Sequence, residues 1–517
     1  MINLKKVNKS CVAAVILAMC LMTSGCGSQN YTTNNKNTNT TVTSSITAQD
    51  TNVTHADDAD NYKTEITGEF SITSTDGSTI TQNDSIYTIT QAGEYTVTGL
   101  LSEGQIVVNA DDNAEITIVL NGTSITCSNG SPIYIKNADN IKIKSEENTY
   151  NCIVDARAEA DDNSDNSSSE NGNAAIYAAC DLKLVGKGAL SVTGNYNNGI
   201  QSKDDISIKN VTIKVNAVNN AIKGNDEVAI ESGEIIAISR KGDGIKTSNS
   251  SLSNKGKQKG NVIISGGNID IYAACDGIDA AYGVDVSGDG NLNIYTDTYS
   301  NYSEAVAADN SGSSASSVGN PPDMNNSSSN PGMKGNFGGG NRAANGIPGN
   351  NSSGNSSKKS YSTKGIKADS EINISGTAIN ISSTDDGIHA NSDSGVLETG
   401  EDGKGIISIS GGTITISTGD DGIHTDKELN ITDGYINVLT SYEGLEAITI
   451  NISGGQSFIY AADDGINACT GDGSSTPLIN ITGGYIDVTT GSGDTDAIDS
   501  NGSYTQSGGM VLVKGGS

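Results

Sequence analysis

The chain has 517 residues and a formal net charge of −31, with 61 acidic side chains against 30 basic ones. Such an acidic balance argues against binding to nucleic acid and against direct adhesion to anionic lipid. The chain has no tryptophan, 3 phenylalanines and 63 glycines. This composition suits a solenoid with many turns.

The first 25 residues indicate an export signal. Three lysines open the chain, and an apolar stretch from Val12 to Met22 follows that is too short for a stable membrane span. The next four residues, 23–26, resemble a bacterial lipoprotein cleavage box with Thr23 at the usual leucine position, which predicts lipidation of Cys26. The alternative is an ordinary secretory signal cut nearby. In both cases the protein is exported, and lipidation would hold it at the cell surface through its lipid anchor alone.

The rest of the chain divides by composition. Removal of the leader takes away three lysines and no acidic side chain, so the mature charge is −31 − 3 = −34. Residues 26–63 are rich in Asn, Thr, Asp and Ser and predict a disordered tether. Residues 64–150 predict an N-terminal cap and first coils, because an open solenoid end would expose sheet edges. Repeats fill 151–517, interrupted by low-complexity insertions near 156–172, 248–260 and 302–361, the last expected to be a mobile loop.

A short repeated phrase organises the chain from residue 198 onward. Its clearest copy is Asp385-Asp386-Gly387-Ile388-His389, and it returns at 420–424 and 463–467. Steps between copies are about 22 residues, or about ten more, apart from one step with a long insertion. Each copy is followed by alternating apolar runs such as Ile436-Asn437-Val438 and by Gly-Gly or Asp-Gly turns, which indicates short half-buried strands.

One copy cannot bury its apolar face alone, but stacked copies can. The pattern therefore predicts an all-β fold, a right-handed parallel β-helix with three-strand coils of about 22 residues and disordered insertions. Ile, Val and Leu should fill the bore, and Asn, Thr, Ser and Asp should cover the outside.

Stacking brings the residue before each repeated glycine into one column. Coils about 4.8 Å apart would place like charges close enough to repel, and calcium, which takes six to eight oxygens, would relieve this. The glycine is expected to permit a sharp bend there. The alternative is a solvated acidic edge that keeps the protein soluble. The candidate calcium ligands are Asp243, Asp276, Asp385, Asp386, Asp420, Asp421, Glu443, Asp463, Asp464 and Asp496.

A second column follows the isoleucine and includes His389, His424, Lys367 and Glu446. Alternation should point these side chains outward, where a row of polar groups could hydrogen-bond a sugar polymer; plain solvent exposure is the alternative. Zinc binding by the histidine pair lacks a third ligand at the right spacing.

Two other residue types leave alternatives open. Tyr435, Tyr485 and Tyr460 lie at strand positions and could stack on glucan, or pack within the protein. Five cysteines remain after the leader and Cys26, an odd number without metal-type spacing, and the simplest interpretation is small buried side chains. Cys127 and Cys152 lie about one coil apart and could be stacked neighbours.

The Asp-Asp-Gly-Ile-His phrase, the Gly-Gly-x-Ile-x-Ile strands and Tyr442-Glu443-Gly444-Leu445-Glu446 resemble a family of bacterial carbohydrate-binding β-helix proteins. The similarity spans about 64–517. The resemblance implies a fold like that of the family 9 pectate lyases, calcium binding, and binding of cellulose and pectin. It also implies that the three Asp-Asp pairs and Glu443 are calcium ligands.

Three functions follow as hypotheses. The first is a cell-surface polysaccharide-binding protein without catalysis, in which calcium bridges carboxylates of protein and polymer. The second is a pectate lyase, which needs calcium and a basic residue such as Lys246, Lys364 or Lys367. The third is a structural adhesin.

Overall fold

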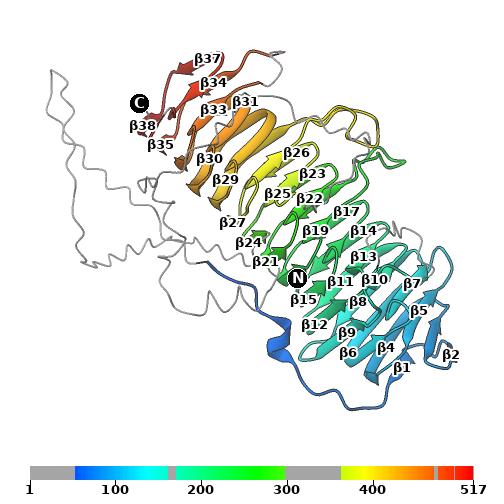
Figure 1. Ribbon diagram of the computed structural model, residues 1–517. Coiled ribbons are helices and arrows are strands. Elements are labelled where there is room, and N and C mark those ends of the chain that lie inside the picture. The colour runs from blue at the N-terminus through cyan, green and yellow to red at the C-terminus, as the bar shows by residue number, and fades with distance from the viewer. Residues whose placement is uncertain (1–52, 161–170, 297–361, 471–474, 494, 516–517) are drawn as a thin grey trace, which may run out of the picture. The chain divides into compact units, whose positions relative to one another are not determined.

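The computed structural model describes residues 53–160, 171–296, 362–470, 475–493 and 495–515. The signal segment, Cys26 and the 302–361 insertion lie outside these residues. The strands wind as successive coils, and hydrogen bonds join each strand to its equivalent in the next coil (Figure 1). The predicted parallel β-helix is confirmed. Among the described residues, no helix is long and apolar enough to cross a bilayer.

Each full coil contributes one strand to each of three parallel ladders, here named sheets 1, 2 and 3. Sheet 1 contains β3 (Ile86–Ile89), β5 (Gln105–Asn109), β7 (Ile133–Asn137), β10 (Ala174–Ala178), β13 (Asn198–Ser202), β16 (Ile222–Lys223), β19 (Ile245–Lys246), β22 (Ile278–Ala280), β25 (Ile366–Ala368), β28 (Ile388–Ala390), the start of β30 (Ile423–Thr440), the start of β31 (Leu445–Ile452), β33 (Ile466–Ala468) and β36 (Asp499–Ser500).

Sheet 2 follows sheet 1 within each coil. It contains β4 (Gly93–Leu101), β6 (Glu115–Cys127), β8 (Asn140–Ser145), β11 (Asp181–Gly186), β14 (Asp205–Lys209), β17 (Glu227–Ile230), β20 (Asn261–Ile264), β23 (Gly283–Val286), β26 (Glu371–Ile374), β29 (Ile406–Ser417), parts of β30 and β31, β34 (Leu478–Ile481) and β37 (Ser503–Gln506).

Sheet 3 completes the coil. It contains the ends of β4, β6, β29 and β30 with β9 (Tyr150–Asp155), β12 (Ala189–Gly194), β15 (Val211–Ala217), β18 (Gly233–Ser239), β21 (Gly267–Ala273), β24 (Gly290–Thr296), β27 (Ala378–Ser382), β32 (Gln456–Ala461), β35 (Tyr485–Thr490) and β38 (Met510–Lys514).

Antiparallel strands cover the N-terminal end of the coils. β1 (Ser71–Ser74) pairs with β4, and β2 (Ile80–Asn83) pairs with β3. Both pairings occupy edges that would otherwise offer free backbone groups to another chain.

The aliphatic residue of the repeated phrase sets the stacking. Parallel pairing aligns Ile200 with its equivalents in the following coils as far as Ile466, and every one of these side chains is fully buried. A shift of one residue would turn the whole set outward, so burial of this ladder fixes the register.

A segment expected to be a tether packs on the coils instead. Residues 53–62 include the 3₁₀ helix η1 (Ala59–Tyr62), and Ala59 is fully buried. Lys214 Nζ lies 2.9 Å from Asp58 and 2.8 Å from Asp60. The tether boundary at residue 63 was therefore placed too late. Residues this polar are held by ion pairs with the coils, which composition does not reveal.

The insertion near 248–260 is ordered. The Ser253 N–H donates to Lys257 O, and Asn249 Nδ2 donates to Asp226 Oδ1 at 2.6 Å. Cys127 and Cys152 are not stacked neighbours, because the register pairs Cys127 with Asp155 and places Cys152 beside Ser124. The five described cysteines are free thiols.

Candidate functional site

The repeated phrase places two columns of polar side chains along sheet 1. The first column holds the residues before the phrase glycine (or the alanine that replaces it): Asn198, Asn220, Asp243, Asp276, Lys364, Asp386, Asp421, Glu443, Asp464 and Asp496. The second column holds the residues after the buried aliphatic: Gln201, Lys223, Lys246, Asp279, Lys367, His389, His424, Glu446, Asn467 and Asp499, which the register brings into line.

One oxygen of most first-column side chains caps the next coil. Asn220 N–H donates to Asn198 Oδ1 at 3.1 Å, and Asp243 N–H donates to Asn220 Oδ1 at 3.1 Å. The same bond, from a backbone N–H to a side-chain oxygen of the preceding coil, recurs in five more pairs, given as donor and acceptor: Asp276 and Asp243, Lys364 and Asp276, Asp421 and Asp386, Glu443 and Asp421, and Asp496 and Asp464. We name this series the capping ladder. It explains why Asn and Asp recur here, since each supplies a short acceptor for a backbone N–H of the next coil.

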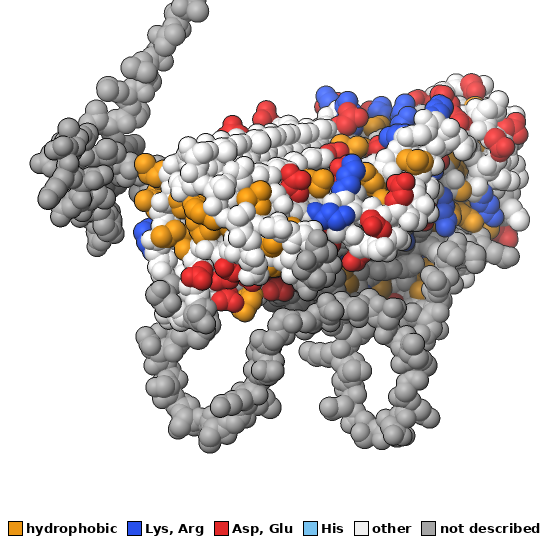
Figure 2. Space-filling model, turned by 90° about the horizontal axis from the view of Figure 1, so that it is seen from above, with side chains coloured by type: hydrophobic (Ala, Val, Ile, Leu, Met, Phe, Trp, Pro, Cys, Tyr) orange, Lys and Arg blue, Asp and Glu red, His pale blue; other side chains and the backbone are white. Residues whose placement is uncertain are grey.

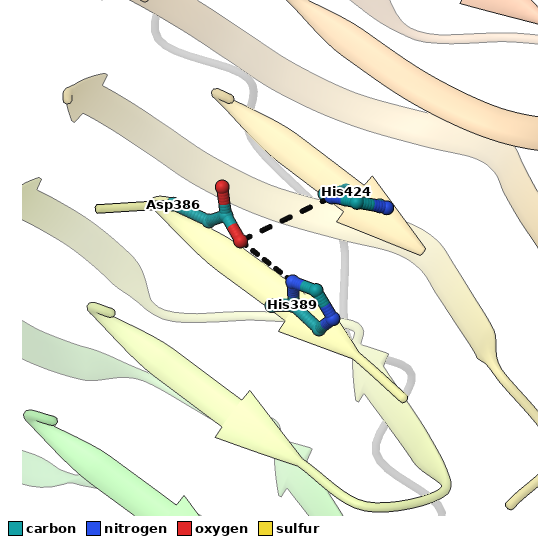
Figure 3. Close-up of side chains that lie close together, drawn as sticks. All are labelled: Asp386, His389 and His424. Carbon is teal, nitrogen blue, oxygen red and sulfur yellow. Dashed lines mark hydrogen bonds and ion pairs between the residues drawn. The ribbon is translucent and has the colours of Figure 1, made fainter. Parts of the chain in front are cut away.

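The second oxygen of the side chain faces the second column. Asp243 Oδ2 accepts from Lys246 Nζ at 2.8 Å, and Asp386 Oδ2 lies 2.6 Å from His389 Nδ1. Figure 3 shows both His389 and His424 turned toward Asp386. Asp243 and Asp386 therefore each stabilise a coil–coil junction and a neighbouring polar side chain at once.

The phrase glycine is needed for space, not for a sharp bend. Gly387 does not lie in the left-handed region, and a Cβ there would come within 2.5 Å of Gly422 O and 2.6 Å of Ile416 Cγ2. The expected role of the glycine was therefore wrong. The phrase strand and sheet 3 approach too closely in the bore for a larger side chain.

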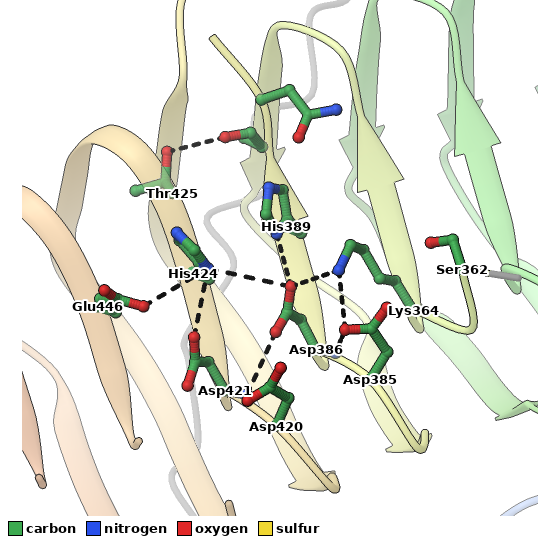
Figure 4. A network of polar contacts seen from close by, with 12 residues as sticks. Ser362, Lys364, Asp385, Asp386, His389, Asp420, Asp421, His424, Thr425 and Glu446 are labelled. Carbon is green, nitrogen blue, oxygen red and sulfur yellow. Dashed lines mark hydrogen bonds and ion pairs between the residues drawn. The ribbon is translucent and has the colours of Figure 1, made fainter. Parts of the chain in front are cut away.

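The second column is not an open surface row. It points away from the bore, yet His389 is only 8% exposed and Asn467 only 7%. The two histidine rings lie 4.5 Å apart, and the dense network around them is seen in Figure 4. Alternation predicted the direction of these side chains correctly but not their burial, because neighbouring coils pack closely around them.

Basic residues are confined to the earlier coils of the two columns. In the middle coils, Lys246 contacts Asp243 and Asp279, and Lys367 Nζ lies 3.1 Å from Asp279. From Glu443 to Asp499 the columns hold carboxylates and Asn467 but no basic residue. Figure 2 shows one face of the molecule, on which Lys and Arg side chains are interspersed with Asp and Glu.

Burial raises the pKa values of carboxyls in the acidic coils. The pKa of Glu443 rises to about 8 and that of Glu446 to about 7, with neighbouring carboxylates adding to burial. Burial alone would also raise the pKa of Asp386, but the bond to His389 and the charge of Lys364 hold it well below its usual range. The columns therefore contain two kinds of carboxylate. The charge of Asp386 is balanced by Lys364, whereas Glu443 and Glu446 have no lysine partner among the described ion pairs.

The lysines that a lyase would need are held in ion pairs. Lys364 Nζ lies 2.9 Å from Asp385 and 2.6 Å from Asp386. Burial would lower the pKa values of Lys246, Lys364 and Lys367, but the surrounding aspartates raise all three. A general base needs a neutral amine near neutral pH, so this environment opposes that role.

A turn beside the first column carries the more exposed groups. Asp385, Asp420, Tyr442 and Asp463 occupy the same position in successive coils, and backbone bonds link Asp420 to Tyr442 and Tyr442 to Asp463. We name these four residues the turn strip. Tyr442 is 50% exposed, and partial burial together with Asp421 and Asp386 raises the pKa of Asp420 to about 6. The strip thus combines three carboxylates that the sequence predicted as calcium ligands with the accessible ring of Tyr442, which the sequence did not single out as a ligand.

Two tyrosines predicted to bind sugar, Tyr435 and Tyr485, lie on sheet 3 on either side of Phe458. The Phe458 ring lies 5.3 Å from Tyr435 and 5.6 Å from Tyr485. All three are half-buried, so the row presents ring edges or faces at the surface while packing together. Tyr460 is half-buried and outside this row.

The described carboxylate clusters differ in how well they fit calcium. Asp385, Asp386 and Asp420 offer oxygens within 4.8 Å of one another, as do Asp243, Asp276 and Asp279. These all-oxygen sets match the donor type that calcium prefers. Lysines already neutralise part of both clusters. Asp276 and Asp420 have no lysine paired to them among the described ion pairs, and Asp420 is exposed whereas Asp276 is buried, so Asp420 is the carboxylate most available to a cation.

A family model described as "Carbohydrate-binding domain-containing protein" matches residues 83–401 and 396–497. The chain belongs to this family. The matched residues include both columns up to Asp496 and the whole turn strip.

Two individual proteins also match. A carbohydrate-binding domain-containing protein of Acetivibrio thermocellus is 39% identical over 129 residues, covering 24% of this chain and 44% of that protein. The chain therefore matches less than half the length of this relative. A solved structure of a polysaccharide lyase-like protein from C. thermocellum, a gadolinium derivative, is 35% identical, with 42% of this chain and 84% of that chain covered and a TM-score of 0.39.

Proposed function

We propose that this family member binds plant cell-wall polysaccharide, pectic or cellulosic, at the cell surface, with calcium and without cleaving it. The observation that supports the proposal most directly is the turn strip. It sets the carboxylates of Asp385, Asp420 and Asp463 on either side of the exposed Tyr442 ring.

Calcium would be held by Asp385, Asp386 and Asp420, and it would supply a positive charge shared with uronate carboxylates of the polymer. Without such a cation, an acidic protein repels an acidic polymer. Tyr442 offers an apolar ring face to a sugar, and Tyr435 and Tyr485 offer a second aromatic surface. The non-catalytic reading rests on the ion-paired state of Lys246, Lys364 and Lys367.

Sedimentation of the purified chain with insoluble cellulose or calcium-pectate gel tests this function. We expect binding to pectate in calcium and its loss in EGTA. Asp420→Asn should weaken pectate binding about tenfold, the size of one lost charged contact. Glu147→Gln, an equal loss of charge on an exposed residue of the N-terminal coils, is the matched control.

Two further readouts separate the alternatives. Tyr442→Ala should weaken cellulose binding more than pectate binding, because only the ring contact is removed. No unsaturated product should accumulate from polygalacturonate with calcium. Failure of the chain to sediment with either polymer would refute the proposal and favour a structural adhesin, whereas a calcium-dependent rise in unsaturated product would favour a lyase.

A further inference from the structure

One cluster in the acidic coils combines a histidine nitrogen with carboxylate oxygens and has no lysine paired to it among the described ion pairs. Asp421 Oδ2 lies 3.3 Å from His424 Nδ1, and Glu446 Oε2 lies 3.6 Å from the same nitrogen. All three donor atoms fall within 4.8 Å of one another. From these positions we infer that Asp421, His424 and Glu446 form a binding site for a divalent transition metal, with Zn²⁺ as the best-fitting ion.

The spacing fits tetrahedral coordination before any ion is added. Zinc binds nitrogen and oxygen at about 2.0–2.2 Å, which places neighbouring ligands about 3.3–3.5 Å apart in a tetrahedron. The two measured separations from His424 Nδ1 are close to this value. Only small side-chain movements would be needed to bring three ligands to one ion.

The backbone holds the ligands in place. Asp421 Oδ1 accepts from the Glu443 N–H at 3.3 Å within the capping ladder, which leaves Oδ2 facing His424. With Nδ1 as the ligand, His424 Nε2 carries the proton, and Asp426 Oδ1 lies 3.8 Å from it. A carboxylate beside the far nitrogen orients a ligating imidazole and makes it more basic. Figure 4 shows Asp421 and Glu446 converging on His424 from two adjacent coils.

A fourth donor stands next to the cluster. Cys469 Sγ lies 3.0 Å from Glu446 Oε1, and a pocket of about 150 Å³ is lined by His424, Asp426, Glu446 and Cys469 among others. The pocket gives an ion or water a route to the site. Nitrogen and sulfur donors favour zinc and other transition metals over calcium, which prefers oxygen alone.

Charge separates this cluster from the other candidate clusters. Each of the three all-carboxylate clusters contacts a lysine. Lys246 contacts the cluster of Asp243, Asp276 and Asp279, and Lys364 contacts the cluster of Asp385, Asp386 and Asp420. Lys259 contacts the cluster of Asp204, Asp205 and Asp226. Among the ion pairs of the described residues, none joins a lysine or arginine to Asp421 or Glu446. The alternative set of Asp386, His389 and His424 is weaker, because Lys364 Nζ lies 2.6 Å from Asp386 Oδ2.

A buried amide beside Glu446 is a second sign of a missing partner. Asn467 is the strand neighbour of Glu446 and is 7% exposed. Its Nδ2 donates to Glu443 Oε2 at 2.8 Å, while its Oδ1 has no hydrogen-bond partner. A buried polar atom without a partner is costly, and a water bound to a metal ion beside Glu446 would supply a donor.

Metal analysis of the full purified chain tests the site without any polysaccharide, so its result is independent of the proposed function. After chelation and reloading with one equivalent of Zn²⁺, wild type should retain the metal through gel filtration, in the presence of excess calcium. Co²⁺ should give the intense visible absorption of a tetrahedral site. His424→Gln and Glu446→Gln should each weaken retention about tenfold or more.

His389→Gln and His55→Gln are matched controls that should retain zinc within about twofold of wild type. Circular dichroism checks that each variant is folded. If His424→Gln unfolds, zinc retention by Glu446→Gln and the Co²⁺ spectrum of wild type still test whether the site exists. Failure of wild type to retain zinc would overturn the inference, as would an unchanged affinity in folded His424→Gln or Glu446→Gln. Loss of zinc in His389→Gln would move the site to Asp386 and overturn the assignment of Asp421 and Glu446.

Discussion

Replacement of Asn220 by alanine tests the capping ladder where no charge complicates it. Asn220 is 4% exposed, its Oδ1 accepts from Asp243 N–H at 3.1 Å, and its Nδ2 donates to Asn198 Oδ1 at 3.0 Å. Asn198 Oδ1 keeps the bond from the backbone N–H of residue 220. Alanine therefore leaves one buried donor, the N–H of Asp243, without a partner.

The cost follows from that one orphaned group. A lost neutral hydrogen bond is worth about 0.5–1.5 kcal/mol, and leaving its buried partner unsatisfied brings the cost to about 1–3 kcal/mol. In a solenoid this cost is local, since each coil contacts mainly its neighbours. It should therefore act on the opening of the coils on either side of Asn220.

Hydrogen–deuterium exchange read on peptides around residue 243 is the assay. If these amides exchange through local opening, a cost of about 1.4 kcal/mol corresponds to about tenfold faster exchange in Asn220→Ala. Asn220→Asp retains an acceptor, so its exchange rate around residue 243 should lie between those of wild type and Asn220→Ala. Asn373→Ala, an exposed amide on sheet 2, is the control. Unchanged exchange around residue 243 in Asn220→Ala would show that the ladder bonds do not stabilise the coil junctions.

Two further predictions concern the acidic coils and the N-terminal segment. Burial raises the folded-state pKa of Glu443 from 4.5 to about 8. The folded state therefore binds more protons, so this contribution is fully present below about pH 4.5 and is lost as pH rises toward about 8. In chelator, the midpoint of thermal unfolding should fall over that range, and Glu443→Gln should flatten the fall; an unchanged slope would contradict this. Separately, Lys214→Ala removes the ion pairs to Asp58 and Asp60, so limited proteolysis within 53–62 should become several-fold faster, whereas Lys209→Ala should not change it; equal cleavage rates would show that these pairs do not hold the segment.

Sequence periodicity was enough to predict which residues stack. The spacing of Ile200, Ile222 and Ile245 gave the coil length and the register of sheet 1, because burial of one aliphatic per coil allows no slippage. It also predicted that Asp386 and Asp421 lie in one column. These results depend on strand alternation, which is a property of the backbone.

Periodicity could not reveal which atoms bond. The Oδ1 of Asp386 caps a backbone N–H and its Oδ2 contacts His389, a division set by side-chain torsions. Asp426 and Cys469 were missed beside His424 because they lie just past the repeated phrase, where nothing in its repeat marks them. The packing of residues 53–62 depends on Lys214, more than 150 positions away, and no local pattern carries such a contact.

The capping ladder also continues across the longest gap between coils. Lys364 N–H donates to Asp276 Oδ1 at 2.8 Å although 88 residues separate them, and β25 pairs with β22 in the same register as its neighbours. This bond of the ladder is thus formed by the backbone of Lys364 and the side chain of Asp276, which lie on either side of the long connection. A peptide epitope or a whole enzyme inserted between β24 and β25 would still be followed by β25 in the same register, which makes this junction a suitable place for insertions.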